Sequence, residues 1–180
     1  MGPWRASVIG AFNEPWTRLR ARLNGLEDDE LFWEPVAGCW SVRSGDEGRW
    51  VLEGGDPRER ASAPPVTTIA WRLSHLGGEV LGGFAHQRFG AGESTFDAPE
   101  VVHAARDVDA YLERHYRAWC GALEAISDDE WASPLGEGWG PYAASTTADL
   151  ALHVLDEVTH HAAEVAVLRD LYARRFATRP

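Results

Sequence analysis

The chain has 180 residues, the length of one globular domain, and its 17 basic and 28 acidic residues give a formal net charge of −11. This charge excludes the clustered basic surface on which binding to a nucleic-acid backbone depends, so we expect no nucleic-acid partner. All the basic residues are arginines, which excludes Schiff-base catalysis and P-loop phosphate binding because both require a lysine amine. A hydrophobic content of 44% with 25% charged residues is typical of a soluble globular protein.

Cysteine usage and the N-terminal sequence indicate a cytoplasmic location. Cys39 and Cys120 lie far apart and form no C-x-x-C pair, so the sequence has no disulfide framework of the kind found in secreted proteins. The N-terminal segment MGPWRASVIG has no long apolar run and indicates neither a signal peptide nor a membrane-spanning helix. We therefore expect one soluble domain over residues 1–180, with no membrane partner.

Four stretches have the apolar spacing of helices. They run from about Ser7 to Leu26, Thr67 to Arg88, Val101 to Ile126 and Thr147 to Phe176. The sequence therefore predicts an all-α protein, and four helices in one small domain favour an up-down-up-down four-helix bundle.

The segment between the first two helices, about Glu27 to Pro65, is long for a connection inside a compact domain, and we expect it to cover one end of the bundle. Two pieces within it, GCWSVRSG and RWVLEGG, are candidate short strands. Its first part, GLEDDELFWEPVAGCWS, is similar to AISDDEWASPLGEGWG after the third helix. Two pseudo-symmetric helical hairpins or two convergent helix-ending turns would each explain this similarity. Ser127-x-x-Glu130 has the spacing of a capping box, which predicts a short helix there.

The last helix carries polar residues on its apolar side. At about 100° per residue, its apolar residues fall within about 80° of arc. These residues are Leu150, Val154, Val158, Val165, Leu168 and Tyr172. His161 lies inside this arc and Glu157 only about 20° outside it, whereas His153 and His160 lie roughly 60–80° away. Helical spacing therefore selects Glu157 and His161 as the inward-pointing polar pair.

An inward carboxylate is costly unless it is paired, protonated or coordinated. The i, i+4 spacing brings Glu157 and His161 to one point in space, which favours binding of a metal ion. A buried Glu–His ion pair without metal is the alternative.

Three pieces of the sequence, WSVRSG, WRLSHLGGE and HVLDEVTHHAAEVAVLRDLY, resemble the DinB-like superfamily of metalloenzymes, from about Leu26 to Tyr172. The resemblance implies a four-helix bundle that holds a metal with one histidine on the second helix and two residues on the fourth, commonly an H-x-x-x-H pair. Here Glu157 takes the first of these two positions and His161 the second. This substitution resembles the branch of the mycothiol-dependent maleylpyruvate isomerase N-terminal domain, in which the ligands are His, Glu and His.

The resemblance implies His75, in the W-x-x-x-H piece that begins at Trp71, as the remaining ligand. Helical periodicity places His75 away from the apolar stripe of its own helix, on the side of Arg72 and Glu79, so an ordinary exposed histidine is the alternative. Two histidines and one carboxylate leave an open coordination position, as in catalytic sites. This donor set suits one divalent ion, with zinc as the first expectation and nickel or iron as alternatives.

The resemblance further implies an enzyme that uses a low-molecular-weight thiol, such as mycothiol, as cofactor or co-substrate. The metal would hold the sulfur as a thiolate for attack on an electrophilic small-molecule substrate, as in an S-transferase or a related isomerase. Several further residues are candidates for lining the pocket or supporting the ligands, and solvated helix flanks are the alternative explanation. They are Glu79, His153, Asp156, His160, Glu164 and Arg169.

Two other functions stay open. A ferritin-like di-iron oxidoreductase uses paired E-x-x-H motifs, and Glu100-x-x-His103 and Glu157-x-x-His160 have this spacing. A stress-response or binding module with a non-catalytic metal would share all the features described above.

Two further features concern the substrate and the oligomeric state: tryptophans in loops and an exposed apolar helix flank. Trp40, Trp50, Trp131 and Trp139 lie in expected loops, where they would either wall a substrate pocket or fill irregular packing. An exposed apolar helix flank would also suit a homodimer.

Overall fold

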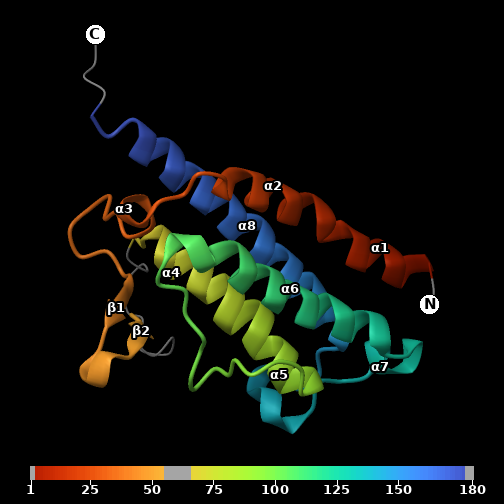
Figure 1. Ribbon diagram of the computed structural model, residues 1–180. Coiled ribbons are helices and arrows are strands. Elements are labelled where there is room, and N and C mark those ends of the chain that lie inside the picture. Colours follow the sequence, from red (N-terminus) through yellow and green to blue (C-terminus); the bar gives the residue numbers. More distant parts are fainter. Residues whose placement is uncertain (1–2, 55–65, 177–180) are drawn as a thin grey trace.

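The computed structural model describes residues 3–54 and 66–176, and within them the protein is mostly helical, in agreement with the expected all-α class. In chain order the elements are α1 (Pro3–Ala11), α2 (Asn13–Leu23), α3 (Asp28–Leu31), β1 (Val42–Ser44), the 3-10 turn η1 (Asp46–Gly48), β2 (Trp50–Leu52), α4 (Ile69–Ser74), the π-helix η3 (His75–Gly83), α5 (Phe84–Phe89), the 3-10 turn η4 (Ala105–Asp107), α6 (Val108–Ala125), α7 (Asp128–Ala132), the 3-10 segment η5 (Glu137–Tyr142) and α8 (Thr147–Ala173). Figure 1 shows α1–α2, α4–α5, α6 and α8 packed side by side.

The first expected helix is divided into α1 and α2 at Phe12. Pro15 explains the division, because it has no N–H to donate to the carbonyl oxygen four residues earlier. Phe12 keeps helical backbone angles, and its buried ring fills the core at the join. Helix formation begins at Pro3, four residues before the predicted start.

The second expected helix is continuous from Ile69 to Phe89, but its middle is widened into a π-helix, which apolar spacing did not predict. Thr68 caps its start by accepting the N–H of Trp71. The π-helix contains two glycine pairs, in the sequence HLGGEVLGG. A Cβ on Gly77 would overlap the ring of Tyr111, and one on Gly78 would overlap a carbonyl oxygen of the segment before α6. These glycines therefore let neighbouring chain segments pack directly on the helix backbone.

The segment of residues 90–107 returns along this glycine helix instead of turning tightly. Ser94 Oγ donates to the Gly78 carbonyl at 2.7 Å, and the Val102 N–H donates to Ser74 Oγ at 3.0 Å. Because these contacts fix residues 101–104 in a non-helical backbone, the third helix begins at Val108 and not at Val101 as predicted.

This return path makes α6 parallel to α4–α5. Gly77 faces Tyr111, and Gly82, further along, faces His115. The expected up-down-up-down order is therefore wrong, because a connection that spans the length of a helix brings the chain back to the end from which that helix began. The path is visible in Figure 1 as the green segment beside α4 and α5.

The last helix runs opposite to α4–α5 and parallel to α2. Arg88 at the end of α5 donates to Thr147 at the start of α8, whereas Arg72 in α4 pairs with Glu164 far along α8. Arg22 in α2 pairs with Asp170 near the end of α8. A capping box of Thr146 and Asp149 starts α8. The helices enclose one core, which includes Phe12, Leu19, Leu73, Leu112, Trp119, Val154, Val158 and Val165.

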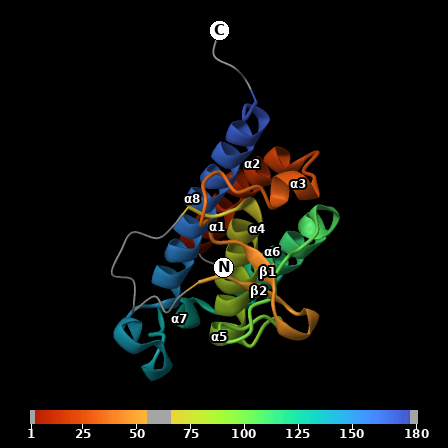
Figure 2. The same ribbon diagram turned by 90° about the vertical axis from the view of Figure 1, so that its left-hand side faces the viewer.

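Two short expected elements are present. Strands β1 and β2 form an antiparallel pair with Val42 opposite Leu52, and this hairpin lies beside α4 in both views (Figures 1 and 2). The capping box of Ser127 and Glu130 starts α7, as predicted. The two Asp-Asp-Glu sequences both form short helices, α3 and α7. Residues 55–65 of the expected covering loop lie outside the described residues.

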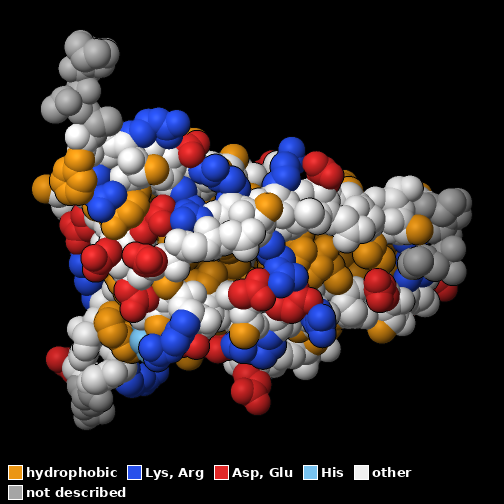
Figure 3. Space-filling view, turned by 45° about the horizontal axis from the view of Figure 1, so that its top comes forward, with side chains coloured by type: hydrophobic (Ala, Val, Ile, Leu, Met, Phe, Trp, Pro, Cys, Tyr) orange, Lys and Arg blue, Asp and Glu red, His pale blue; other side chains and the backbone are white. Residues whose placement is uncertain are grey.

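Acidic and arginine side chains are interspersed on the face shown in Figure 3. Arg20, for example, pairs with Asp109 and Glu113 across the boundary between α2 and α6. None of the helices within the described residues is long and apolar enough to cross a membrane.

Candidate metal centre

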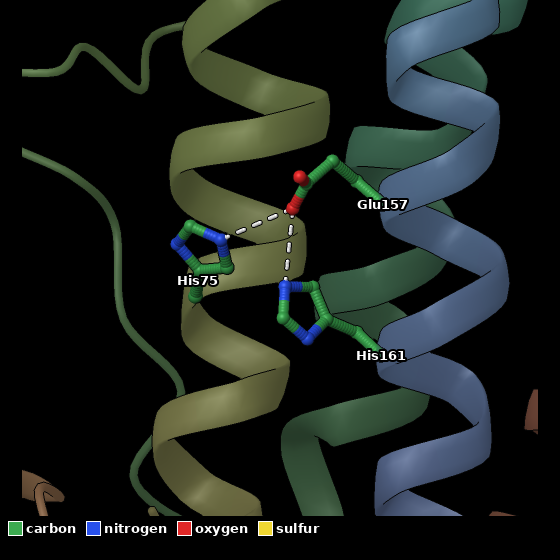
Figure 4. Close-up of side chains that lie close together, drawn as sticks. All are labelled: His75, Glu157 and His161. Atoms are coloured by element: carbon green, nitrogen blue, oxygen red, sulfur yellow. Dashed lines mark hydrogen bonds and ion pairs between the residues drawn. The ribbon is translucent and has the colours of Figure 1, made fainter. Parts of the chain in front are cut away.

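Three of the side chains singled out in the sequence meet between α8 and the glycine helix. His75 is the first residue of η3, and Glu157 and His161 lie one turn apart on α8; the three point toward one another in Figure 4. Glu157 Oε2 lies 3.1 Å from His161 Nε2 and 3.5 Å from His75 Nε2. One possible ligand atom from each residue lies within 4.8 Å of the others. An ion could therefore bind at this point with small side-chain adjustments.

The other ring nitrogen of each histidine is held by a carboxylate. His75 Nδ1 donates to Glu79 at 2.6 Å, and His161 Nδ1 donates to Glu164 at 2.6 Å. In a neutral imidazole with its proton on Nδ1, Nε2 carries the lone pair that a metal would bind, whereas in an imidazolium Nε2 donates to Glu157 instead. A carboxylate at Nδ1 is the arrangement that orients metal-binding histidines in proteins, and it accounts for two of the sequence candidates, Glu79 and Glu164.

His75 belongs to the site although it lies off the apolar stripe of its own helix. The structure places it where helical periodicity did, on the side of Arg72 and Glu79, and all three line one pocket. Glu79 lies one turn after His75, which brings the two side chains together. Segments of π-helix occur frequently at functional sites.

The electrostatic environment of the site favours the ionised carboxylate of Glu157 and the protonated ring of His75. Burial raises the pKa of the Glu157 carboxyl, but hydrogen bonds from His161 and His75 lower it more, and the net shift is well below its usual range. Burial lowers the pKa of His75, but the carboxylates of Glu157 and Glu79 outweigh burial and the net shift is upward. His161 is almost fully buried, with 5% of its side chain exposed.

Arg72 and Trp71, which precede His75, support the site and were not predicted as site residues. Arg72 pairs with Glu164 at 3.1 Å, and burial lowers its pKa in spite of this carboxylate. The Trp71 ring stacks on the His75 ring with centroids 4.9 Å apart, and its indole N–H donates to the carbonyl of Glu53 after β2. The hairpin is thereby linked to the first ligand. The position of Arg72 on the His75 side of the helix was the available signal.

A pocket of about 710 Å³ opens onto the three side chains, within the usual size range for small-molecule sites. Aromatic side chains form much of its apolar wall, and the acidic side chains of the site and Glu53 form much of its polar wall. The aromatic residues are Trp40, Trp71, Phe84 and Phe96. The site is therefore accessible to a small molecule.

The remaining candidate histidines lie at the edge of this pocket. His153 Nε2 is 3.9 Å from Glu157 Oε1, and His160 Nε2 is 3.8 Å from Glu157 Oε2, but both side chains are largely exposed. His160 Nδ1 also lies 3.1 Å from the Asp156 carbonyl oxygen of its own helix. The flank position that helical spacing gave them is correct.

Arg169 is not part of the site, contrary to expectation. Its guanidinium pairs with Glu30 at 2.9 Å and donates to the carbonyl oxygens of Arg22 and Asn24. It lies about two turns beyond His161 on α8, where it joins that helix to the end of α2 and to α3. Its function is structural.

The di-iron arrangement is absent from the described residues. Glu100 pairs with Arg114 and with His115, whereas the His103 ring stacks on Trp50. Neither residue belongs to a described group whose ligand atoms converge. Glu157 therefore lacks the second E-x-x-H motif that this reading required.

The loop tryptophans divide between core and pocket. Trp131 is fully buried and donates to the Leu123 carbonyl, so it fills the core. Trp50 lies on the hairpin outside the metal pocket, whereas Trp40 lines it. Trp139 lines a separate apolar pocket.

Two histidine nitrogens and one carboxylate oxygen are donors that zinc and other divalent transition metals accept, and the carboxylate partners at both Nδ1 atoms fit such an ion. A Glu–His ion-pair network without metal uses the same contacts, because an imidazolium donates from Nδ1 to one carboxylate and from Nε2 to another.

A family model described as the DinB superfamily matches residues 11–165. The search of curated proteins and the search of solved structures gave no match.

Proposed function

This chain belongs to the DinB superfamily, and from that premise we propose that it is a metal-dependent enzyme whose divalent ion is held by His75, Glu157 and His161. The observation that carries the proposal is the orientation of the two histidines. Both Nε2 atoms face the same oxygen of Glu157, and both Nδ1 protons are held by carboxylates. Three protein ligands leave a position open for a substrate, and zinc is the ion we expect first.

We propose that the substrate includes a low-molecular-weight thiol, as in the mycothiol-dependent branch that the His, Glu, His set resembles. A bound divalent ion would supply a positive charge that keeps a thiol sulfur deprotonated at neutral pH. The thiol would lose its proton to solvent, and its sulfur would form a bond to an electrophilic carbon of a second small molecule as the leaving group on that carbon departs with its bonding electron pair.

The protein's own cysteines favour an external thiol. Cys39 is buried and its Sγ lies against the Val36 carbonyl oxygen. Burial raises the pKa of the Cys120 thiol to about 11, so this group stays protonated near neutral pH. Neither cysteine lines the metal pocket.

The residues around the three ligands have two roles, to orient the histidines and to line the pocket. Glu79 and Glu164 fix the ring orientation of the two histidines, and Arg72 compensates part of the negative charge by pairing with Glu164. The aromatic wall of the pocket limits the water around the open position and favours an uncharged substrate surface.

Elemental analysis of the purified protein tests the metal site. We expect one divalent ion per wild-type chain and its loss in His161→Ala. His86→Ala is the matched control, because His86 is exposed, bonds the Gly92 carbonyl and does not line the pocket. Stoichiometric metal in His161→Ala would overturn the site, and two irons per chain would favour the di-iron reading.

Replacement of the ion by cobalt(II) tests the thiol. Addition of a small thiol should produce a sulfur-to-cobalt charge-transfer band in the wild-type spectrum, and this band should be absent from metal-free protein. If the thiol leaves the cobalt spectrum unchanged, the thiol-dependent reaction is wrong even if the metal site is correct. The outcome separates an S-transferase from a module with a non-catalytic metal.

We further propose that the four long helical segments form a four-helix bundle with an up-down-down-up order, supported by the pairings of α2, α4–α5, α6 and α8 described above. Cytoplasmic location, a single domain over residues 1–180 and a homodimer stay predictions. Size-exclusion chromatography with light scattering would test the homodimer.

A further inference from the structure

A second pocket, of about 260 Å³, lies beside the metal pocket between α5, η5 and the first turns of α8. Leu135, Trp139 and Leu150 form its apolar wall. Phe84 and His153 line this pocket and the metal pocket alike, so their side chains stand between the two. The two pockets are therefore neighbours that one ligand could span.

Among its described lining residues, the second pocket has one carboxylate and one histidine as the groups that titrate at or below neutral pH. Its acidic side chain, Asp149, accepts the N–H and the hydroxyl of Thr146 at 2.7 and 2.8 Å in the capping box of α8. Ser145 and Tyr142 are the uncharged polar residues of the lining. The rest of the lining is apolar or uncharged, and it suits an uncharged, largely apolar group.

Aromatic rings shape the wall nearest the metal site. Phe84 and Trp139 lie nearly parallel, with an interplanar angle of 15° and centroids 5.9 Å apart. The His153 ring meets the Phe84 ring edge-on, with centroids 5.8 Å apart, and its Nε2 lies 3.9 Å from Glu157 Oε1. Flat aromatic walls of this kind favour a planar ring or a short alkyl chain.

The size of the pocket indicates that it holds a part of a ligand. Pockets for whole small molecules usually exceed about 300 Å³. The metal pocket, at about 710 Å³, has room for the rest of the molecule. The boundary between the two pockets faces solvent at His153, whose side chain is 53% exposed.

We propose that the second pocket is a subsite of the metal centre, and that it takes an uncharged apolar group, such as a phenyl ring, of a small molecule whose polar end lies at the metal ligands. The inference rests on the proposed function, because it assigns the apolar part of that site's substrate. It gives Trp139 and Phe84 a role in substrate choice and leaves the chemistry to the residues around Glu157.

Hydroxamic acids serve as probes, because the hydroxamate group binds divalent metals and its substituent can be varied. Isothermal titration calorimetry on the zinc-loaded protein compares acetohydroxamic acid with a series of phenylalkyl hydroxamic acids of increasing chain length. Burial of a phenyl ring should make the best member of the series bind about tenfold more tightly, or more. Ser145→Phe, which fills the pocket, should abolish this gain and leave acetohydroxamic acid unaffected. Ser44→Phe, the same change on the exposed hairpin, should keep the gain.

A second variant guards against a folding defect in the first. Trp139→Ala removes the wall without filling the pocket, and it should also lose the phenyl gain, while circular dichroism and zinc content stay as in the wild type. Equal affinity of all probes for the wild type, or a phenyl gain that persists in Ser145→Phe, would overturn the subsite while the metal site stands.

If the protein bound no metal, the proposed function would fail, and phenylalkyl alcohols would then test the subsite alone. Saturation-transfer NMR should detect their contact with the metal-free wild type and a loss of this contact in Ser145→Phe. Absence of contact with the wild type would overturn the subsite as well.

Discussion

The hydrogen bond from His75 to Glu79 offers the most direct test of how the site is organised. Glu79→Gln keeps the shape and a carbonyl acceptor for the His75 Nδ1 proton but removes the charge, and Glu79→Ala removes the acceptor. Loss of such a partner costs about 10–100-fold in metal affinity. Because charge-assisted hydrogen bonds are about twice as strong as neutral ones, we expect about tenfold for Gln and about 100-fold for Ala. These factors correspond to about 1.4 and 2.7 kcal/mol of binding free energy.

The equivalent carboxylate on α8 should behave differently. Glu164 holds His161 and also pairs with Arg72, whose side chain is only 18% exposed. Glu164→Gln should therefore weaken metal binding and also lower the free energy of unfolding of the metal-free protein. Because Glu164 is 41% exposed, solvent screening limits this second loss to about 1 kcal/mol or less.

Zinc affinity is measured by competition with a chromophoric chelator, and stability by urea denaturation of the metal-free protein. Asp156→Asn is the matched control, because this carboxylate is 79% exposed on the same helix and belongs to neither histidine of the site. Unchanged zinc affinity in both Glu79 variants would refute the reasoning that the carboxylates orient the ligands.

Three further predictions concern the fold and the cysteine. Gly78→Ala should destabilise the protein by about 3 kcal/mol in urea denaturation, because its Cβ would overlap a backbone oxygen, whereas Gly121→Ala, with open space around it in α6, should change stability by about 1 kcal/mol or less in the favourable direction. Arg169→Ala should lower the free energy of unfolding by about 3 kcal/mol, because it leaves the buried Glu30 unpaired. Its zinc affinity should be unchanged, and a loss of zinc binding would show that Arg169 supports the metal site. Since the pKa of Cys120 is raised to about 11, its alkylation at pH 8 should be about 100-fold slower than expected for the ordinary thiol pKa of 9.0 and should accelerate up to about pH 11; a rate that levels off near pH 9 would contradict the raised pKa.

Much of the secondary structure followed from local patterns. The apolar spacing of the last helix is a property of contiguous sequence, so its start at Thr147 was predicted as observed, and its end was predicted three residues beyond Ala173. The break at Phe12 also has a local cause, Pro15, but the prediction of one helix from Ser7 to Leu26 missed it. The π-helix could not be predicted from a local pattern. Its glycines permit the conformation, but contacts with α6 and with residues 90–107 select it.

The candidate site shows the same division. Glu157 and His161 lie on one helix, so a count of about 100° per residue was enough to bring them together. His75 lies on another helix and off its apolar stripe, so the apolar spacing of that helix did not select it, and only the resemblance to a known family pointed to it.

The sequence by itself therefore determined the helical class, the inward Glu157–His161 pair and the flank position of His160, because helix periodicity and capping depend on neighbours a few residues away. The tertiary structure alone decided the parallel course of α6, the approach of His75, the carboxylate behind each histidine and the removal of Arg169 from the site. These depend on the path of residues 90–107 and on backbone contacts at glycines, which join segments distant in the sequence and leave no periodic signal in either one.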